Sequence, residues 1–283
     1  MEEVAAKYVL LDIEIITLLA LAIGVGIFAA VRRKMGHLIP ATSNWDIYDL
    51  FLMFLPALMF LMGPFILVAA AQTATDSKGV QIDDAAPSYG ALFFNLGIYI
   101  FVFMMVHAIV EWIRLRNMSE VFGLKKVGFP RVVIYTIVGG VFSILLCVWL
   151  VGSISEHWIS GMFEGLREQV PVRSLQQAES RVFLVMAIFS AVVAAPIAEE
   201  FLFRGYMYGA LKNATGRLFA SVMISLLFAV VHGNLPALLP LFVFSVILCF
   251  AYDFTGSLWV PVGLHAFFNA TNIVLMLTQQ PIE

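Results

Sequence analysis

Apolar runs about as long as a membrane is thick dominate this sequence and constrain its fold more than any other feature. A helix needs about 20 mostly apolar residues to cross the hydrocarbon core of a bilayer, and we find about eight such runs. They lie near residues 9–31, 47–71, 91–110, 132–151, 181–213, 218–231, 237–254 and 258–277. They predict an all-α fold, a polytopic transmembrane bundle of about eight spans.

The composition argues against a soluble protein. The chain has 61% hydrophobic and 12% charged residues, whereas a typical soluble domain has about 45–50% apolar and about 25% charged residues. A soluble fold of this length must cover its surface with polar side chains, and this chain has few. The net charge of −3 indicates no basic surface, so we expect no nucleic-acid partner.

Basic residues follow alternate runs and predict the orientation of the chain. They cluster at positions 32–34, 114–131 and 212–217. Short loops rich in Lys and Arg stay in the cytoplasm, so these three loops are expected on that side and both termini outside. We expect a multi-pass integral protein of the plasma (inner) membrane, with lipids as its constant partners. No repeat or low-complexity linker divides residues 1–283, which indicates one membrane domain.

Two glutamates interrupt the fifth apolar run. Burying an ionisable residue in a span costs at least ~2.5–3.5 kcal/mol, so Glu199 and Glu200 are informative. Adjacent helical residues point about 100° apart, which lets the two carboxylates do different jobs. Glu200 and Arg204 are spaced i,i+4 and are expected to pair, whereas Glu199 has no such partner and is the candidate general base. The alternative is a helix end at the interface with solvated charges.

A histidine ends the sixth run. A lone His232 in this place is often structural, but a helical hairpin turning near Thr215 changes the argument. Glu199 is then 16 residues before the turn and His232 is 17 after it. At 1.5 Å per residue both lie ~24–26 Å from the turn, at nearly the same depth. A carboxylate and an imidazole facing each other there can deprotonate a water between them.

The last run carries two polar residues, His265 and Asn269. Their i,i+4 spacing stacks both side chains on one helix face. A His N–H and an Asn amide are suitable donors for a developing oxyanion. The alternative is a hydrogen bond that packs this helix against a neighbour.

These three interruptions, in this order, resemble the signatures of the CPBP family of CAAX proteases and bacteriocin-processing enzymes, also called the ABI family. The motifs read Glu199-Glu200-x-x-x-Arg204, Phe228-x-x-x-His232 and His265-x-x-x-Asn269. The resemblance covers residues 181–277, the expected catalytic core.

The resemblance implies an intramembrane endopeptidase that hydrolyses a membrane-associated protein or peptide, prenylated or not. By this resemblance Glu199 is the catalytic glutamate, and His232 helps it to activate water. His265 and Asn269 are the oxyanion donors, and Glu200 and Arg204 support them. The Glu and His side chains are also possible zinc ligands, but they form no recognised zinc motif. We therefore favour a metal-free mechanism without a cofactor.

Two other classes of protein fit part of this pattern. Intramembrane Glu and His residues also form proton relays, so a proton-coupled transporter is the main alternative; it would predict inverted repeats, and none is evident. A non-catalytic immunity or scaffold protein of the membrane, keeping the motifs for folding, is the second.

Overall fold

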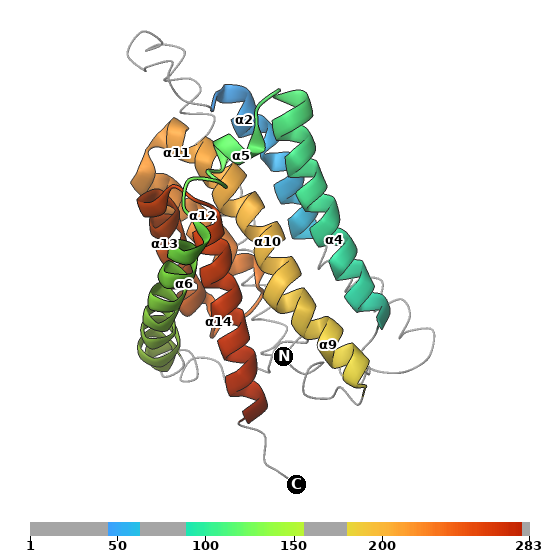
Figure 1. The fold of residues 1–283 in the computed structure, drawn as a ribbon, viewed down its shortest axis with the longest axis vertical. Coiled ribbons are helices and arrows are strands. Elements are labelled where there is room, and N and C mark those ends of the chain that lie inside the picture. Colours follow the sequence, from blue (N-terminus) through green and yellow to red (C-terminus); the bar gives the residue numbers. More distant parts are fainter. Residues whose placement is uncertain (1–44, 63–88, 156–179, 279–283) are drawn as a thin grey trace.

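The computed structural model describes residues 45–62, 89–155 and 180–278. Within these ranges every secondary-structure element is helical. The helices are arranged as a bundle in which α10 and α14 lie near the centre (Figure 1). The predicted all-α fold is confirmed.

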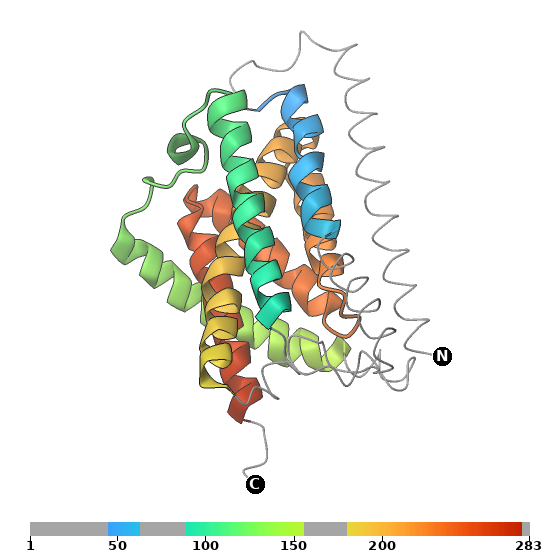
Figure 2. The same cartoon turned by 90° about the vertical axis from the view of Figure 1, so that its right-hand side faces the viewer.

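The first half of the described chain supplies the outer helices. They are α2 (Ile47–Leu52), α4 (Tyr89–His107), η2 (Ala108–Ile113), α5 (Met118–Val121), α6 (Phe129–Ser143) and η3 (Ile144–Gly152). Figure 2 shows α6 and η3, in light green, crossing the other helices at a steep angle. Close packing of α6 against α14 depends on small residues, because a Cβ at Gly140 would collide with the Phe267 ring. Small residues allow membrane helices to approach closely in this way.

The second half forms the inner helices. They are α9 (Arg181–Phe189), η4 (Ser190–Ala194), α10 (Ala195–Glu200), η5 (Phe201–Tyr208), α11 (Gly209–Thr215), α12 (Arg217–Val231), α13 (Leu238–Thr255) and α14 (Trp259–Thr278). The first five form one continuous helix whose middle widens into π-helix on both sides of α10. Gly216, with φ of 91°, makes the turn to α12, where the hairpin was predicted.

Among the described residues, five helices are long and apolar enough to cross a membrane: Tyr89–Ile113, Phe129–Ser155, Arg181–Thr215, Leu238–Thr255 and Trp259–Thr278. Two shorter apolar helices are Tyr48–Met62 and Arg217–Val231. These seven correspond to the second to eighth predicted runs. The run near residues 9–31 lies outside the described residues, so the count of eight stays a prediction. The multi-pass membrane assignment itself is confirmed.

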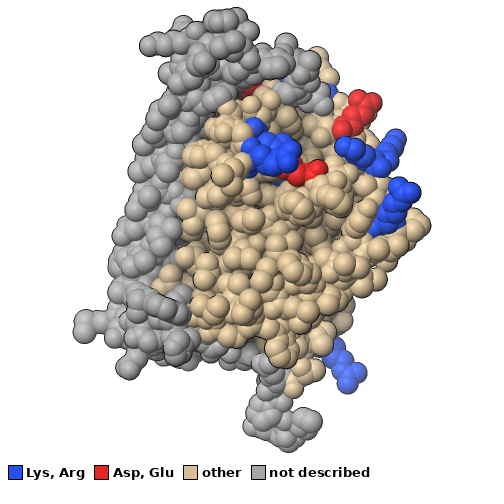
Figure 3. Space-filling view, turned by 90° about the vertical axis from the view of Figure 1, so that its left-hand side faces the viewer, with Lys and Arg blue, Asp and Glu red and all other residues tan. Residues whose placement is uncertain are grey.

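Around its middle, the bundle has apolar side chains outside and a few ionisable ones inside. Ile100, Val138 and Phe254 are 65%, 66% and 70% exposed, whereas Glu200 and Arg204 are 0% exposed. In Figure 3 most charged atoms lie at one end, above a wide uncharged band. Such a surface suits lipid around the middle of the bundle and water at its ends.

Two of the predicted basic loops meet at this charged end. Asn213 in α11 donates a hydrogen bond of 2.9 Å to the carbonyl of Trp45 before α2. Arg114 and Arg116, which follow η2, form ion pairs with Asp46 and Asp49 at the start of α2. The two loops therefore lie on the same side, as predicted. The first basic loop, 32–34, lies outside the described residues.

Candidate active site

Glu199 and Glu200 lie on α10, the short α-helical segment between the two π-helical segments. Glu199 is 5% exposed and Glu200 is 0% exposed. Both belong to the core of the bundle, so the alternative of a solvated helix end is excluded. π-Helical insertions change the direction of the side chains that follow, and they are frequent at functional sites. No sequence pattern had indicated them.

The Glu199 carboxylate faces two imidazole rings. Its Oε2 atom lies 4.0 Å from Nε2 of His232 and 4.0 Å from Nε2 of His265. The proximity of Glu199 and His232 that the helical hairpin predicted is therefore observed. A distance of 4.0 Å is too long for a direct hydrogen bond and suits a bridging water.

Helix α12 fixes the orientation of His232, the residue that caps its C-terminal end. Nδ1 of His232 lies 2.6 Å from the carbonyl oxygen of Phe228. A carbonyl oxygen only accepts hydrogen bonds, so Nδ1 carries the proton. In the neutral ring Nε2 then presents its lone pair toward Glu199. The His232 side chain is 27% exposed, whereas those of Glu199 and His265 are 7% and 3% exposed.

Glu200 joins His265 to Arg204. Its Oε1 atom accepts hydrogen bonds from Nη1 of Arg204 at 2.7 Å and from Nδ1 of His265 at 2.8 Å. The predicted i,i+4 pair is confirmed. The guanidinium also lies over the Phe228 ring, 4.3 Å from its centroid. Paired charges and aromatic faces of this kind stabilise an arginine that water does not reach.

Asn269 lies one turn beyond His265 on α14. Its Nδ2 atom donates a hydrogen bond of 2.8 Å to the carbonyl oxygen of Ala191 in η4. This bond joins α14 to the segment that precedes Glu199. An amide nitrogen carries two hydrogens, so one N–H is used for packing and the second is left for another acceptor. Both sequence interpretations of Asn269 are compatible with this geometry.

Two residues near the site were not singled out from the sequence. Ser245 on α13 accepts a hydrogen bond of 2.7 Å from Nη2 of Arg204. Tyr99 lies on α4, which packs against α10, the helix that carries Glu199. A serine or tyrosine in an apolar run is common, and only the packing of α4 and α13 against α10 and η5 makes these two distinctive.

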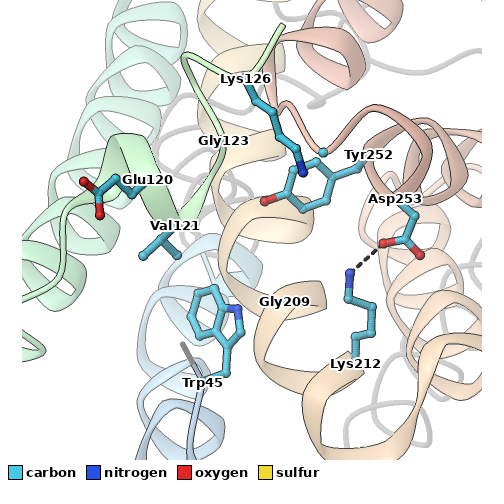
Figure 4. A pocket seen from close by; sticks show the side chains of 10 residues that line it. Trp45, Glu120, Val121, Gly123, Lys126, Gly209, Lys212, Tyr252 and Asp253 are labelled. Carbon is cyan, nitrogen blue, oxygen red and sulfur yellow. Dashed lines mark hydrogen bonds and ion pairs between the residues drawn. The ribbon is translucent and has the colours of Figure 1, made fainter. Parts of the chain in front are cut away.

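A separate pocket of about 270 Å³ opens at the charged end of the bundle. Trp45, Lys126 and Lys212 are among its lining residues, and none of the six predicted site residues lines it. Figure 4 shows Lys212 paired with Asp253, while the Glu120 carboxylate points away from both lysines. The Lys212–Asp253 distance is 2.6 Å. This ion pair joins two of the four charged residues that line the pocket.

The described residues contain no cluster of potential metal ligands. Within residues 45–62, 89–155 and 180–278, no three His, Cys, Asp or Glu side chains are grouped as a metal ion requires.

A family model matches the part of the chain that contains this site. Residues 181–271 match the model of the Rce1-like family, described as type II CAAX prenyl endopeptidase. This range contains Glu199, Glu200, Arg204, His232, His265 and Asn269. The predicted resemblance to CAAX proteases is thereby confirmed for this part of the chain.

Two curated proteins are similar to parts of this chain. "Putative membrane peptidase YdiL" of Bacillus subtilis is 30% identical over 140 residues, which are 50% of this chain and 55% of that protein. "Membrane-embedded CAAX protease MroQ" of Staphylococcus aureus is 30% identical over 96 residues, 32% of this chain and 39% of that protein. The chain thus spans about half the length, or less, of these relatives. No solved structure matches it.

Proposed function

We propose that this protein is an intramembrane endopeptidase in which Glu199 and His232 activate a water molecule. The observation that carries the proposal is the position of Glu199 Oε2, buried and 4.0 Å from an imidazole nitrogen on each of two other helices. A water molecule between Glu199 Oε2 and His232 Nε2 contacts both the carboxylate and the lone pair of the imidazole. General-base catalysis of this type contributes ~10²–10⁴-fold in rate.

The first step joins the water to the scissile carbonyl. The water oxygen forms a bond to the carbonyl carbon, and its proton moves to Glu199. Nε2 of His232 accepts the second hydrogen of the water and orients it, because Nδ1 is held by Phe228. The C=O double bond opens, and its electron pair moves to the oxygen, which becomes an oxyanion.

His265 then stabilises the oxyanion through Nε2–H. Since Nδ1 already donates to Glu200, donation from Nε2 requires the doubly protonated ring. Glu200 balances the charge of that imidazolium. The second N–H of Asn269 is the other proposed donor, and a donor of this type is worth ~10²–10³-fold in rate.

The intermediate collapses when the C–N bond breaks. Glu199 returns its proton to the departing amine, which leaves a carboxylic acid and a free amine. The cluster has no net charge in the state that binds the substrate. The negative charges of the two glutamates, Glu199 and Glu200, are balanced by the positive charges of Arg204 and His265. Neutral, mutually paired groups are those that a membrane interior tolerates best.

The substrate class proposed here is a membrane-associated protein or peptide, prenylated or not. The names of the two relatives, a membrane peptidase and a CAAX protease, support a peptide substrate in a membrane. We place the protein in the plasma (inner) membrane, as one domain with its catalytic core at about residues 181–277. The mechanism uses no metal or cofactor, so a chelator should leave cleavage unchanged.

A cleavage assay with purified protein in detergent tests the proposal. A matched pair of synthetic peptides, one prenylated at a CAAX cysteine and one unmodified, is incubated with wild type and with Glu199→Gln. Products are identified by mass spectrometry. We expect wild type to cleave at least one peptide and Glu199→Gln to be ~10²–10⁴-fold slower, because the amide cannot accept the proton.

Equal rates for wild type and Glu199→Gln would remove Glu199 from the mechanism. Reconstitution of both proteins in liposomes with a pH-sensitive dye separates the transporter alternative. Proton flux that depends on Glu199, without cleavage of either peptide, would favour a transporter over a peptidase.

A further inference from the structure

A buried chain of hydrogen bonds runs from α13 to His265. Ser245 Oγ accepts from Arg204 Nη2 at 2.7 Å, and Arg204 Nη1 donates to Glu200 Oε1 at 2.7 Å. The same carboxylate oxygen accepts from Nδ1 of His265 at 2.8 Å. The chain therefore ends on the ring whose Nε2 atom lies 4.0 Å from Glu199.

Solvent does not reach this chain of hydrogen bonds. Ser245, Glu200 and Arg204 are all 0% exposed, and His265 is 2% exposed. Arg204 Nε has no hydrogen-bond partner among the described residues, so Ser245 and Glu200 are the hydrogen-bond acceptors that hold the guanidinium. Buried donors of a charged group that lose an acceptor find no substitute in a dry site.

The position of the guanidinium determines that of the carboxylate. Glu200 uses one oxygen for both Arg204 and His265, and its Oε2 atom has no hydrogen-bond partner among the described residues. If the Arg204 guanidinium rotates, Glu200 Oε1 moves with it, because the two groups are hydrogen-bonded. The imidazole follows, and a misplacement of about 1 Å at a reacting group can cost ~10²-fold in rate.

We infer that Ser245 is a positioning residue for the proposed peptidase reaction, acting through Arg204 and Glu200 on His265. The inference rests on the proposed function. Ser245 touches neither the proposed water nor the substrate. Its role is to keep Arg204 aligned, so that Glu200 presents His265 with Nε2 toward the oxyanion.

Three variants of the full chain test this inference in the same peptide assay. Ser245→Ala removes the acceptor, and Ser245→Thr keeps a hydroxyl. Ser225→Ala is the matched control, because Ser225 on α12 is also 0% exposed and is not a hydrogen-bond partner of Arg204. Folding of each variant is followed by thermal melting in detergent.

We expect Ser245→Ala to lower kcat by ~10–100-fold, with KM unchanged, because only the alignment of a reacting group is lost. Ser245→Thr should restore most of the rate, and Ser225→Ala should resemble wild type. If the alanine variant does not fold, Ser245→Cys replaces it, since a thiol of similar size is a weaker acceptor and should give an intermediate kcat.

Three results would overturn the inference. They are a wild-type kcat in folded Ser245→Ala, an equal loss in Ser225→Ala, and a failure of folded Ser245→Thr to recover. Wild type and Glu199→Gln are measured alongside. If those two are equally active or equally inactive, the proposed function fails; if they differ as expected, only the role of Ser245 is in question.

Discussion

Two clusters of arginines and carboxylates in this bundle use the same chemistry for different ends. At the charged end, Asp49 lies 3.1 Å from Arg114 and 2.9 Å from Arg116. In the interior, Glu200 lies 2.7 Å from Arg204. Both carboxylates are completely buried, yet the arginines of the first cluster are 19% and 20% exposed and Arg204 is 0% exposed.

The clusters differ in how completely their polar atoms are paired. All four carboxylate oxygens of Asp46 and Asp49 accept hydrogen bonds. In the interior, Glu199 Oε2, Glu200 Oε2 and Arg204 Nε have no such partner among the described residues. Buried polar groups in a purely structural cluster are nearly always satisfied. The first cluster therefore has the complete pairing of a structural network, and the second departs from it at the residues of the proposed active site.

Removing Arg204 should have the largest effect on this comparison. Arg204→Ala removes the guanidinium from the buried Glu200 charge and leaves His265 as its remaining hydrogen-bond partner. Removing one partner of a buried ion pair typically costs ~3–5 kcal/mol, so both melting temperature and cleavage should fall. The double variant Glu200→Gln, Arg204→Met removes the charge with its partner. It should recover melting temperature without recovering cleavage. Recovery of both by the double variant would show that the interior pair is structural only.

Asn269 and Asn272 offer a matched pair on α14. Asn269 donates across to Ala191, and Asn272 donates to Phe268 of its own helix at 2.8 Å. Asn269→Ala should lower kcat by ~10²–10³-fold if its second N–H binds the oxyanion. Asn272→Ala should cleave like wild type. Similar kcat values for the two variants would limit Asn269 to helix packing.

Arg114 provides the corresponding test at the charged end. Arg114→Ala removes one of the two arginines that contact Asp49, and Arg116 remains. Because the pair is partly exposed, we expect a loss of ~1 kcal/mol or less in stability and unchanged cleavage. Thermal melting and the peptide assay measure both. A large loss of cleavage at an unchanged melting temperature would contradict the division between the clusters.

The smallest expected effect is the pH dependence of the charged end. The pKa of Asp46 lies below its ordinary value: burial acts to raise it, and the hydrogen bond and charge of Arg114 outweigh that effect. A carboxylate with a lowered pKa stabilises the fold above its unfolded value, and the contribution is lost as pH falls through the folded value. Melting temperatures between pH 6 and pH 3 should therefore fall less steeply in Asp46→Asn than in wild type.

Much of the site was predictable because its residues break strong local patterns. Glu199, Glu200 and Arg204 stand out in an apolar run, and helical periodicity pairs Glu200 with Arg204. The turn at Gly216 follows from a helix-breaking Thr-Gly step, so the depth of His232 follows from the rise of a helix. Ser245 carries no comparable signal, because a single serine is cheap to bury and is common in membrane helices.

The amino-acid sequence by itself determined a multi-pass helical bundle and the six ionisable or polar residues of its candidate site. Hydrophobic length and helical spacing are local properties, and they act before any helix packs. Only the tertiary structure decided that Glu200 binds His265, that Ser245 holds Arg204, and that Glu199 faces both imidazoles. Those relations depend on how α10, α12, α13 and α14 rotate against one another, and the π-helical segments beside Glu199 alter that rotation in a way no periodic pattern records.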